Sequence, residues 1–191
     1  MYKRIVLKLS GEALAGDKEG VSFDDAVVSG LVKQIRQVME MGTQVCLVGG
    51  GNFWRGRSAD SAMDRTKADQ IGMLATVMNA IYLADAFRQQ GTKAVIQTPV
   101  VFGTMTELFS KDSALAHLEN GEVLIFAAGL GHSFFSTDTI TALRGAELDV
   151  DGLFFAKNID GVYDDDPAKN PNAKKFDVIT SEDIVKKNLK V

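Results

Sequence analysis

Short apolar runs alternate along the chain with longer segments in which apolar residues recur every three to four positions. Apolar runs of this length, bounded by turn residues, are typical of buried strands. They predict strands at residues 5–9, 44–48, 93–97, 122–127 and 153–156. The longer segments predict helices that end near Gly42, Gly91, Gly121 and Leu148, and a short helix that begins within residues 180–183.

Polar residues that can accept hydrogen bonds from free backbone N–H groups stand where these helices begin. Ser22-Phe23-Asp24-Asp25 has the form of a capping box and predicts the start of the first helix. Ser110, and either Ser136 or Thr137, can cap two later helices. Residues 63–90 predict one long helix whose pattern is interrupted by Gly72.

Strands that alternate with helices predict βαβ units and a mostly parallel sheet covered on both faces. We therefore expect an α/β protein, a three-layer αβα sandwich, as one domain over residues 1–191. In such sheets ligands bind beyond the carboxyl ends of the strands. Glycines follow the first, second and fourth predicted strands at that edge, together with Lys8 and Arg55.

Composition narrows the class of protein. The chain has 46% hydrophobic and 24% charged residues and a formal net charge of −4, which argues against general nucleic-acid binding. The one cysteine, Cys46, lies in an apolar strand, so we expect a buried, inert thiol and a cytoplasmic protein without disulfides. The N-terminal residues lack the apolar region of a signal peptide, and we expect no membrane-spanning segment.

The glycine turns indicate a binding site for phosphate groups. Gly49-Gly50-Gly51 at the end of a buried strand exposes main-chain N–H groups, and Arg55 offers a planar fork for phosphate oxygens. A tight turn with a solvated arginine is the alternative for this motif alone. The chain lacks the dinucleotide fingerprint after its first strand, and residues 11–18 do not fit a Walker loop. Cations and backbone donors around one cleft suit phosphoryl transfer.

Five segments together resemble one family. Lys8-Leu9-Ser10-Gly11-Glu12-Ala13 and the run Gly49 to Gly56 are similar to the amino-acid-kinase superfamily. The segments 69–79, 129–138 and 160–163 narrow the resemblance to its bacterial uridylate kinases, over essentially the whole chain. The resemblance implies the amino-acid-kinase fold and transfer of the ATP γ-phosphate to UMP, in pyrimidine nucleotide biosynthesis.

The resemblance also implies roles for individual residues. Lys8, Arg55 and Asp138 would be catalytic, with Lys8 on the transferred phosphoryl group and Asp138 orienting Lys8. ATP would be bound by Lys8, Leu9, Ser10, Gly11, Gly51, Arg55, Asn158, Tyr163 and Asp166. UMP would be bound by Gly50, Asp69, Leu130, Gly131, His132, Ser133, Phe134, Phe135, Ser136 and Thr137. Mg²⁺ would arrive with ATP, and no metal ligand of the protein itself is assigned.

The resemblance further implies a homo-oligomer, a hexamer, with GTP as activator and UTP as inhibitor. We expect the loop 16–20, with Lys18 and Glu19, to serve regulation, and the helix 63–90 to serve assembly. Its apolar residues occupy too much of the circumference to face one sheet. Neither a nucleic acid nor a membrane is expected as a partner.

Three departures from the family pattern stand out. His132-Ser133 replaces the usual Asn-Pro, which should loosen the UMP loop. Residues 157–159 are one residue shorter than in many relatives, and relatives continue beyond Val191 with strands that complete the sheet.

Other interpretations remain open. The chain could be an amino-acid or carbamate kinase, or a nucleotide-sensing module that lost catalysis. We expect His117 to be a surface residue and Asp164-Asp165-Asp166 to form a solvated turn. Asp151 could lie near the metal–ATP or simply at the entry to a strand.

Overall fold

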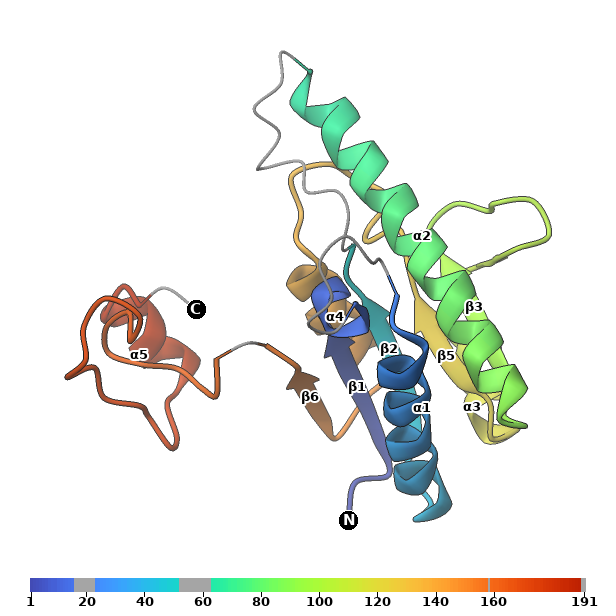
Figure 1. Ribbon diagram of the computed structural model, residues 1–191, viewed down its shortest axis with the longest axis horizontal. Coiled ribbons are helices and arrows are strands. Elements are labelled where there is room, and N and C mark those ends of the chain that lie inside the picture. The colour runs from blue at the N-terminus through green and yellow to red at the C-terminus, as the bar shows by residue number, and fades with distance from the viewer. Residues whose placement is uncertain (16–22, 52–62, 158, 190–191) are drawn as a thin grey trace. The chain divides into compact units, whose positions relative to one another are not determined.

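The computed structural model describes residues 1–15, 23–51, 63–157 and 159–189 (Figure 1). The chain divides into two compact units, Met1–Ala156 and Lys157–Val191, and each is described by itself. The expectation of one domain over residues 1–191 stays a prediction.

A parallel sheet forms the centre of the first unit. Its described strands are β1 (Arg4–Leu9), β2 (Gln44–Gly49), β3 (Ala94–Thr98), β4 (Glu107–Leu108), β5 (Val123–Phe126) and β6 (Gly152–Phe155). They lie in the order β4-β3-β5-β2-β1-β6, and each neighbouring pair is parallel. All of these strands therefore end at one edge, and the predicted α/β class is confirmed.

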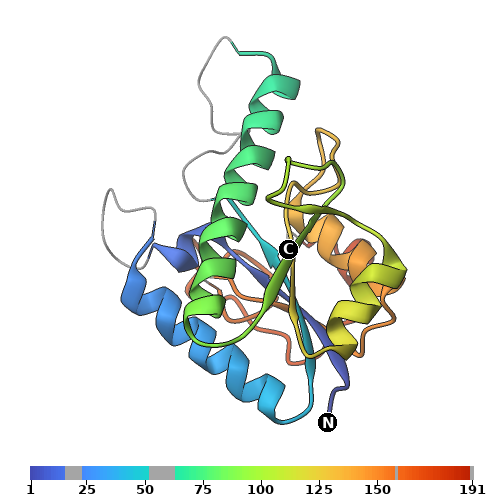
Figure 2. The same ribbon diagram turned by 90° about the vertical axis from the view of Figure 1, so that its right-hand side faces the viewer.

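Helices cover both faces of this sheet (Figure 2). In β2, Val45 and Leu47 point into a core with α1 (Asp25–Glu40) and α2 (Arg65–Gln89). Cys46 and Val48 point into the opposite core, with α3 (Lys111–Glu119) and α4 (Thr137–Glu147). Because side chains alternate between the faces of a strand, one apolar run supplies both cores. The expected three layers are present.

Cys46 is completely buried in the second core. Burial raises the pKa of its thiol to about 12, because the thiolate cannot be solvated there. The thiolate is the reactive form, so the expected inert thiol agrees with this environment.

The helix ends follow the predicted chemistry with one correction. Asp24, not Ser22, is the N-cap of α1, and its Oδ1 accepts hydrogen bonds from the N–H groups of Ala26 and Val27. A carboxylate at this position satisfies free N–H groups and complements the helix dipole. Ser110 and Ser136 cap α3 and α4 as predicted, and Gly42 ends α1 in the left-handed conformation.

The helix α2 runs unbroken from Arg65 to Gln89, through Gly72, and Asp64 is its N-cap. By length and composition alone it could cross a membrane, so the expectation that no segment could span one is wrong. Its residues Ala75, Val77, Leu83 and Phe87 are nevertheless buried, as in the core helix of a globular unit.

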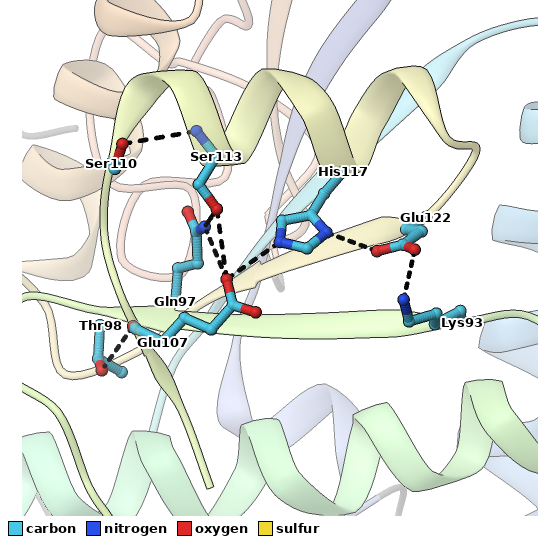
Figure 3. Close-up of polar contacts among 8 residues, drawn as sticks. All are labelled: Lys93, Gln97, Thr98, Glu107, Ser110, Ser113, His117 and Glu122. Carbon is cyan, nitrogen blue, oxygen red and sulfur yellow. Dashed lines mark hydrogen bonds and ion pairs between the residues drawn. The ribbon is translucent and has the colours of Figure 1, made fainter. Parts of the chain in front are cut away.

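The edge strand β4 is held by a network of charged side chains (Figure 3). His117 on α3 lies between two carboxylates, with Nδ1 2.6 Å from Glu122 Oε2 and Nε2 3.0 Å from Glu107 Oε2. Lys93 pairs with the other oxygen of Glu122 at 2.6 Å. His117, which was predicted to be a surface residue, is partly buried, since its side chain is 19% exposed.

The second unit contains the predicted short helix, α5 (Ser181–Lys186), whose N-cap is Thr180, and a bridge between Tyr163 and Lys175. The acidic run 164–166 is exposed, and its carboxylates accept hydrogen bonds from nearby N–H groups. The predicted solvated turn is confirmed. Across the described ranges, no group of three or more His, Cys, Asp or Glu residues could hold a metal ion.

Asp151 belongs to the first unit and marks the entry to the sheet. Its Oδ2 accepts hydrogen bonds from the N–H groups of Lys3 and Arg4, where β1 begins. Since this is the edge opposite the strand ends, Asp151 has the strand-entry role rather than a place beside a metal–nucleotide complex.

Replacing Glu122 by Gln tests the network. Burial alone would raise the pKa of Glu122, but hydrogen bonds from Lys93 and His117 lower it below its usual 4.5. A lowered pKa in the folded state stabilises the protein above pH 4.5, and that contribution is lost as pH falls further. We expect Glu122→Gln to lower the free energy of unfolding at pH 7 by roughly 1–3 kcal/mol.

Denaturant unfolding at pH 7 and pH 3 measures this difference, which should shrink at pH 3 because the unfolded chain already binds a proton at Glu122 below its ordinary pKa of 4.5. Asp85→Asn is the control, because the Asp85–Arg88 pair is exposed and screened by solvent. An equal loss for both variants would contradict a special role for the buried carboxylate.

Candidate active site

Lys8 reaches the sheet edge from the face that α4 covers. It lies two residues after Val6, which is buried in the core with α3 and α4, so both side chains point to that face. The Lys8 side chain is 12% exposed, and its Nζ lies 3.4 Å from Oδ1 of Asp138, in the first turn of α4. An opposite charge at this distance offsets the loss of solvent around the ammonium. The structure thus brings together two of the three predicted catalytic residues.

The turns after β1 and β2 touch through their backbones. The N–H of Gly50 donates to the carbonyl of Leu9 at 3.0 Å. A Cβ atom at Gly50 would lie 3.0 Å from the Gly11 nitrogen and 3.3 Å from the Leu9 oxygen. Only glycine permits this approach without displacing backbone.

Several predicted nucleotide-binding residues therefore lie together at the contact between these two turns. Ser10 and the short 3₁₀ helix Gly11–Leu14 follow β1 directly, and Gly51 continues the second turn. The Leu9 side chain is buried in the core, so the backbone of this residue is what faces the turns.

A third turn follows β5 at the same edge. Ala128, Gly129 and Gly131 all have positive φ angles, of 60°, 55° and 75°. This conformation is strained for Ala128, which carries a Cβ atom. At Gly131 a Cβ atom would lie 3.1 Å from the ring of Pro99, so the residue must remain small.

The segment after this turn is fastened to the start of α2. Asp69 accepts a hydrogen bond from the N–H of Phe134 through Oδ2, at 2.8 Å, and from Arg65 through Oδ1, also at 2.8 Å. Ser133 donates to the carbonyl of Thr66 at 3.3 Å. Asp64, not Asp69, is the N-cap of this helix.

The other residues predicted for this segment lie around these contacts. Phe134 and Phe135 are 67% and 58% exposed, and His132 is exposed as well. Ser136 accepts from the N–H of Thr139 as the cap of α4, and Thr137 is the first residue of that helix. A helix N-terminus favours anions. A looser loop at His132-Ser133 stays a prediction.

Four predicted residues lie outside the described part of the first unit. Arg55 and Asn158 lie outside the described residues, as do Lys18 and Glu19 of the expected regulatory loop. Tyr163 and Asp166 belong to the second unit, which is described by itself. Within that unit the Tyr163 hydroxyl donates to Asp160 at 2.7 Å, and this bond raises the pKa of Tyr163.

The sequence analysis assigned no role to two residues at this edge. Thr76 and Asn79 of α2 are buried and make hydrogen bonds to the third and second turns. The available signal was a pair of polar residues, three positions apart, inside an otherwise apolar segment.

The arrangement suits the handling of phosphate groups. A partly buried lysine with its carboxylate, two touching backbone turns and a helix N-terminus meet at one edge of the sheet. Backbone N–H groups in such turns bind phosphate oxygens, and a fixed cation neutralises charge that moves between them.

Comparisons with known proteins agree with this geometry. Residues 3–190 match the Amino acid kinase family. Uridylate kinases from two strains of Streptococcus thermophilus are 48% identical over 193 residues, covering 100% of this chain and 78% of each relative. A solved UMP kinase from Bacillus anthracis superposes with a TM-score of 0.93 at 34% identity, covering 100% of this chain and 79% of that chain. One from Ureaplasma parvum gives 0.92 at 33% identity, covering 100% and 81%.

Substitution of the central glycine tests the contact between the turns. We expect Gly50→Ala to destabilise the protein by about 1–3 kcal/mol, because the new methyl group is forced against backbone atoms. Thermal unfolding measures the loss. Gly49→Ala is the matched control, because a Cβ atom there meets nothing within 4 Å. Equal melting temperatures for the two variants would contradict the close approach.

Proposed function

The chain belongs to the amino acid kinase family, and we propose that it transfers the γ-phosphate of ATP to UMP, forming UDP and ADP. The observation that carries this proposal is the 48% identity to uridylate kinases, which extends over the entire chain. Full-length superposition on two solved UMP kinases, each above 30% identity, supports the same substrate.

The candidate site supplies what this reaction requires. An oxygen of the UMP phosphate attacks the γ-phosphorus, and the bond from that phosphorus to the ADP oxygen breaks. Since the nucleophile is already an anion, no general base is required. We propose that Lys8 neutralises the phosphoryl group in transit and that Asp138, 3.4 Å away, orients Lys8. Mg²⁺ arrives with ATP and shares this neutralisation.

The turns have separate proposed tasks. Ser10, Gly11 and Gly51 line the ATP phosphates, while Gly50 and residues 130–137 surround UMP. From the family resemblance alone, Arg55, Asn158, Tyr163 and Asp166 are further proposed ATP-binding residues. Asp69 holds the UMP ribose. Hydrogen bonds from Arg65 and from the N–H of Phe134 fix the orientation of its carboxylate near the start of α2.

Two alternatives are less well supported. An amino-acid or carbamate kinase would share the fold, but the similar proteins named above act on uridylate. A nucleotide sensor without catalysis would not require a partly buried Lys8 paired with Asp138.

The substrate proposal is tested by one assay. ATP-dependent formation of ADP is measured with the purified chain and UMP, CMP, aspartate, glutamate or carbamate as acceptor. We expect turnover with UMP to exceed that with every other acceptor. Turnover with an amino acid instead of UMP would refute the proposal.

Lys8→Met tests the proposed catalytic lysine. We expect kcat to fall by roughly 100-fold to 1000-fold while ATP binding changes little, because charge stabilisation matters most in the transition state. Steady-state kinetics and calorimetric titration separate the two effects. Lys33→Met, on the exposed face of α1, should retain wild-type kcat. A Lys8 variant with normal turnover would remove Lys8 from the mechanism.

Assembly is proposed from the outer surface of α2. Leu74, Met78 and Ile81 are 49%, 54% and 38% exposed and follow helical spacing, so they form an apolar stripe. We propose that this stripe belongs to an interface in a cytoplasmic homo-oligomer, a hexamer, activated by GTP and inhibited by UTP. Static light scattering at micromolar concentration should show an oligomer, and a stable monomer would contradict the interface.

A further inference from the structure

The inner face of α2 carries polar side chains where a core helix needs none. Thr76 and Asn79 are 5% and 1% exposed and lie among buried Ala75, Val77 and Ala80. Burying an amide or a hydroxyl is unfavourable unless hydrogen bonds replace those made with water. The bonds that these two side chains make lead to the candidate active site.

Asn79 holds the second glycine turn. Its Nδ2 donates to the carbonyl of Gly50 at 2.7 Å, and the N–H of Gly50 donates in turn to the carbonyl of Leu9 at 3.0 Å. Leu9 follows Lys8 in β1. A continuous path of two hydrogen bonds therefore joins α2 to the turn after β2 and to the strand that carries Lys8.

Thr76 holds the third turn. Its hydroxyl donates to the carbonyl of Met73 at 2.7 Å, which fixes the direction of its lone pairs, and accepts from the N–H of Ala128 at 2.8 Å. Ala128 is the non-glycine residue of this turn with a φ angle of 60°. Such strain persists only where the surroundings hold the backbone in place, and Thr76 supplies one such contact.

The two anchors have a fixed spacing. Residues three positions apart lie on one face of a helix, about 4.5 Å apart along its axis. Asp69, seven positions before Thr76 and so two turns away on the same face, holds Phe134 of the following segment. One rigid helix thus contacts the turn after β2, the turn after β5 and the segment beyond it.

We infer that Thr76 and Asn79 are positioning residues, which set the separation between the Gly49–Gly51 turn and the Ala128–Gly131 turn. The inference rests on the proposed function, in which the two turns hold the ATP phosphates and UMP. Phosphoryl transfer depends on the in-line approach of the two substrates, so a small change in this separation is costly.

The hydrogen bonding of Asn79 argues against a purely structural role. Its Oδ1 is buried and has no hydrogen-bond partner within the described part of the chain. A buried unsatisfied oxygen destabilises the folded state. A leucine of similar size would avoid this cost and would fit the apolar surroundings, but it could not hold Gly50.

Asn79→Leu is the decisive variant. It removes the unsatisfied Oδ1 but leaves the Gly50 carbonyl without its partner, so we expect the melting temperature to change little. We expect kcat for UMP phosphorylation to fall at least about tenfold, because the turn after β2 is no longer held. Leu83→Val, one turn further along the same buried face, is the control and should lower the melting temperature with less effect on kcat.

The corresponding variants of Thr76 provide a rescue test. Thr76→Val removes the acceptor of the Ala128 N–H and should lower kcat, whereas Thr76→Ser keeps the hydroxyl and should restore most of it. Hydrogen exchange followed by NMR gives a readout that needs no substrate. The Gly50 amide should exchange faster in Asn79→Leu, and the Ala128 amide faster in Thr76→Val, but neither amide should do so in Leu83→Val.

The outcomes separate this inference from the proposed function. If wild type fails to phosphorylate UMP, the proposed function is wrong, and the exchange rates alone decide whether α2 holds the turns. If wild type is active and Asn79→Leu keeps its kcat, the positioning role is wrong. The positioning role is also wrong if the loss of kcat relative to the loss of stability is the same for Asn79→Leu as for Leu83→Val.

Discussion

The parallel pairing of β1, β2 and β5 is the constraint on which the site depends. Because these strands run in one direction and in register, the three segments that leave them emerge side by side. The pairing also decides which face each side chain occupies. A shift of one residue would turn Lys8 toward α1 and α2, away from Asp138. The ion pair of the candidate site is thus a consequence of backbone register.

Sequence patterns predicted the structure correctly where the residues of a single helix or strand determine it. The buried strands, the caps Ser110 and Ser136 and the glycines that end helices follow from local chemistry, which is visible in the residues themselves. The resemblance to a family supplied the pairing of Lys8 with Asp138. Spacing could not have supplied it, since the two residues are 130 positions apart.

Three features that the sequence analysis missed or misplaced have a common physical cause, which is that long-range partners decided the outcome. β4 has two residues, too few for a periodic pattern, and forms because β3 offers it a free edge. His117 was placed at the surface because its own helix face gave no reason to bury it, whereas Glu107 and Glu122 come from other elements. Asn79 looked like an ordinary interruption of an apolar helix, because its partner at Gly50 is 29 positions away.

Because Cys46 is buried, the reactivity of its thiol reports on opening of the sheet. The thiol lies on β2, paired between Val6 of β1 and Leu124 of β5, so a reagent can reach it only when the centre of the sheet opens. Since Cys46 is the one cysteine in the sequence, each labelling event has a single origin. The rate of thiol modification therefore measures how often the middle of the sheet separates, on the folded protein and without an introduced probe.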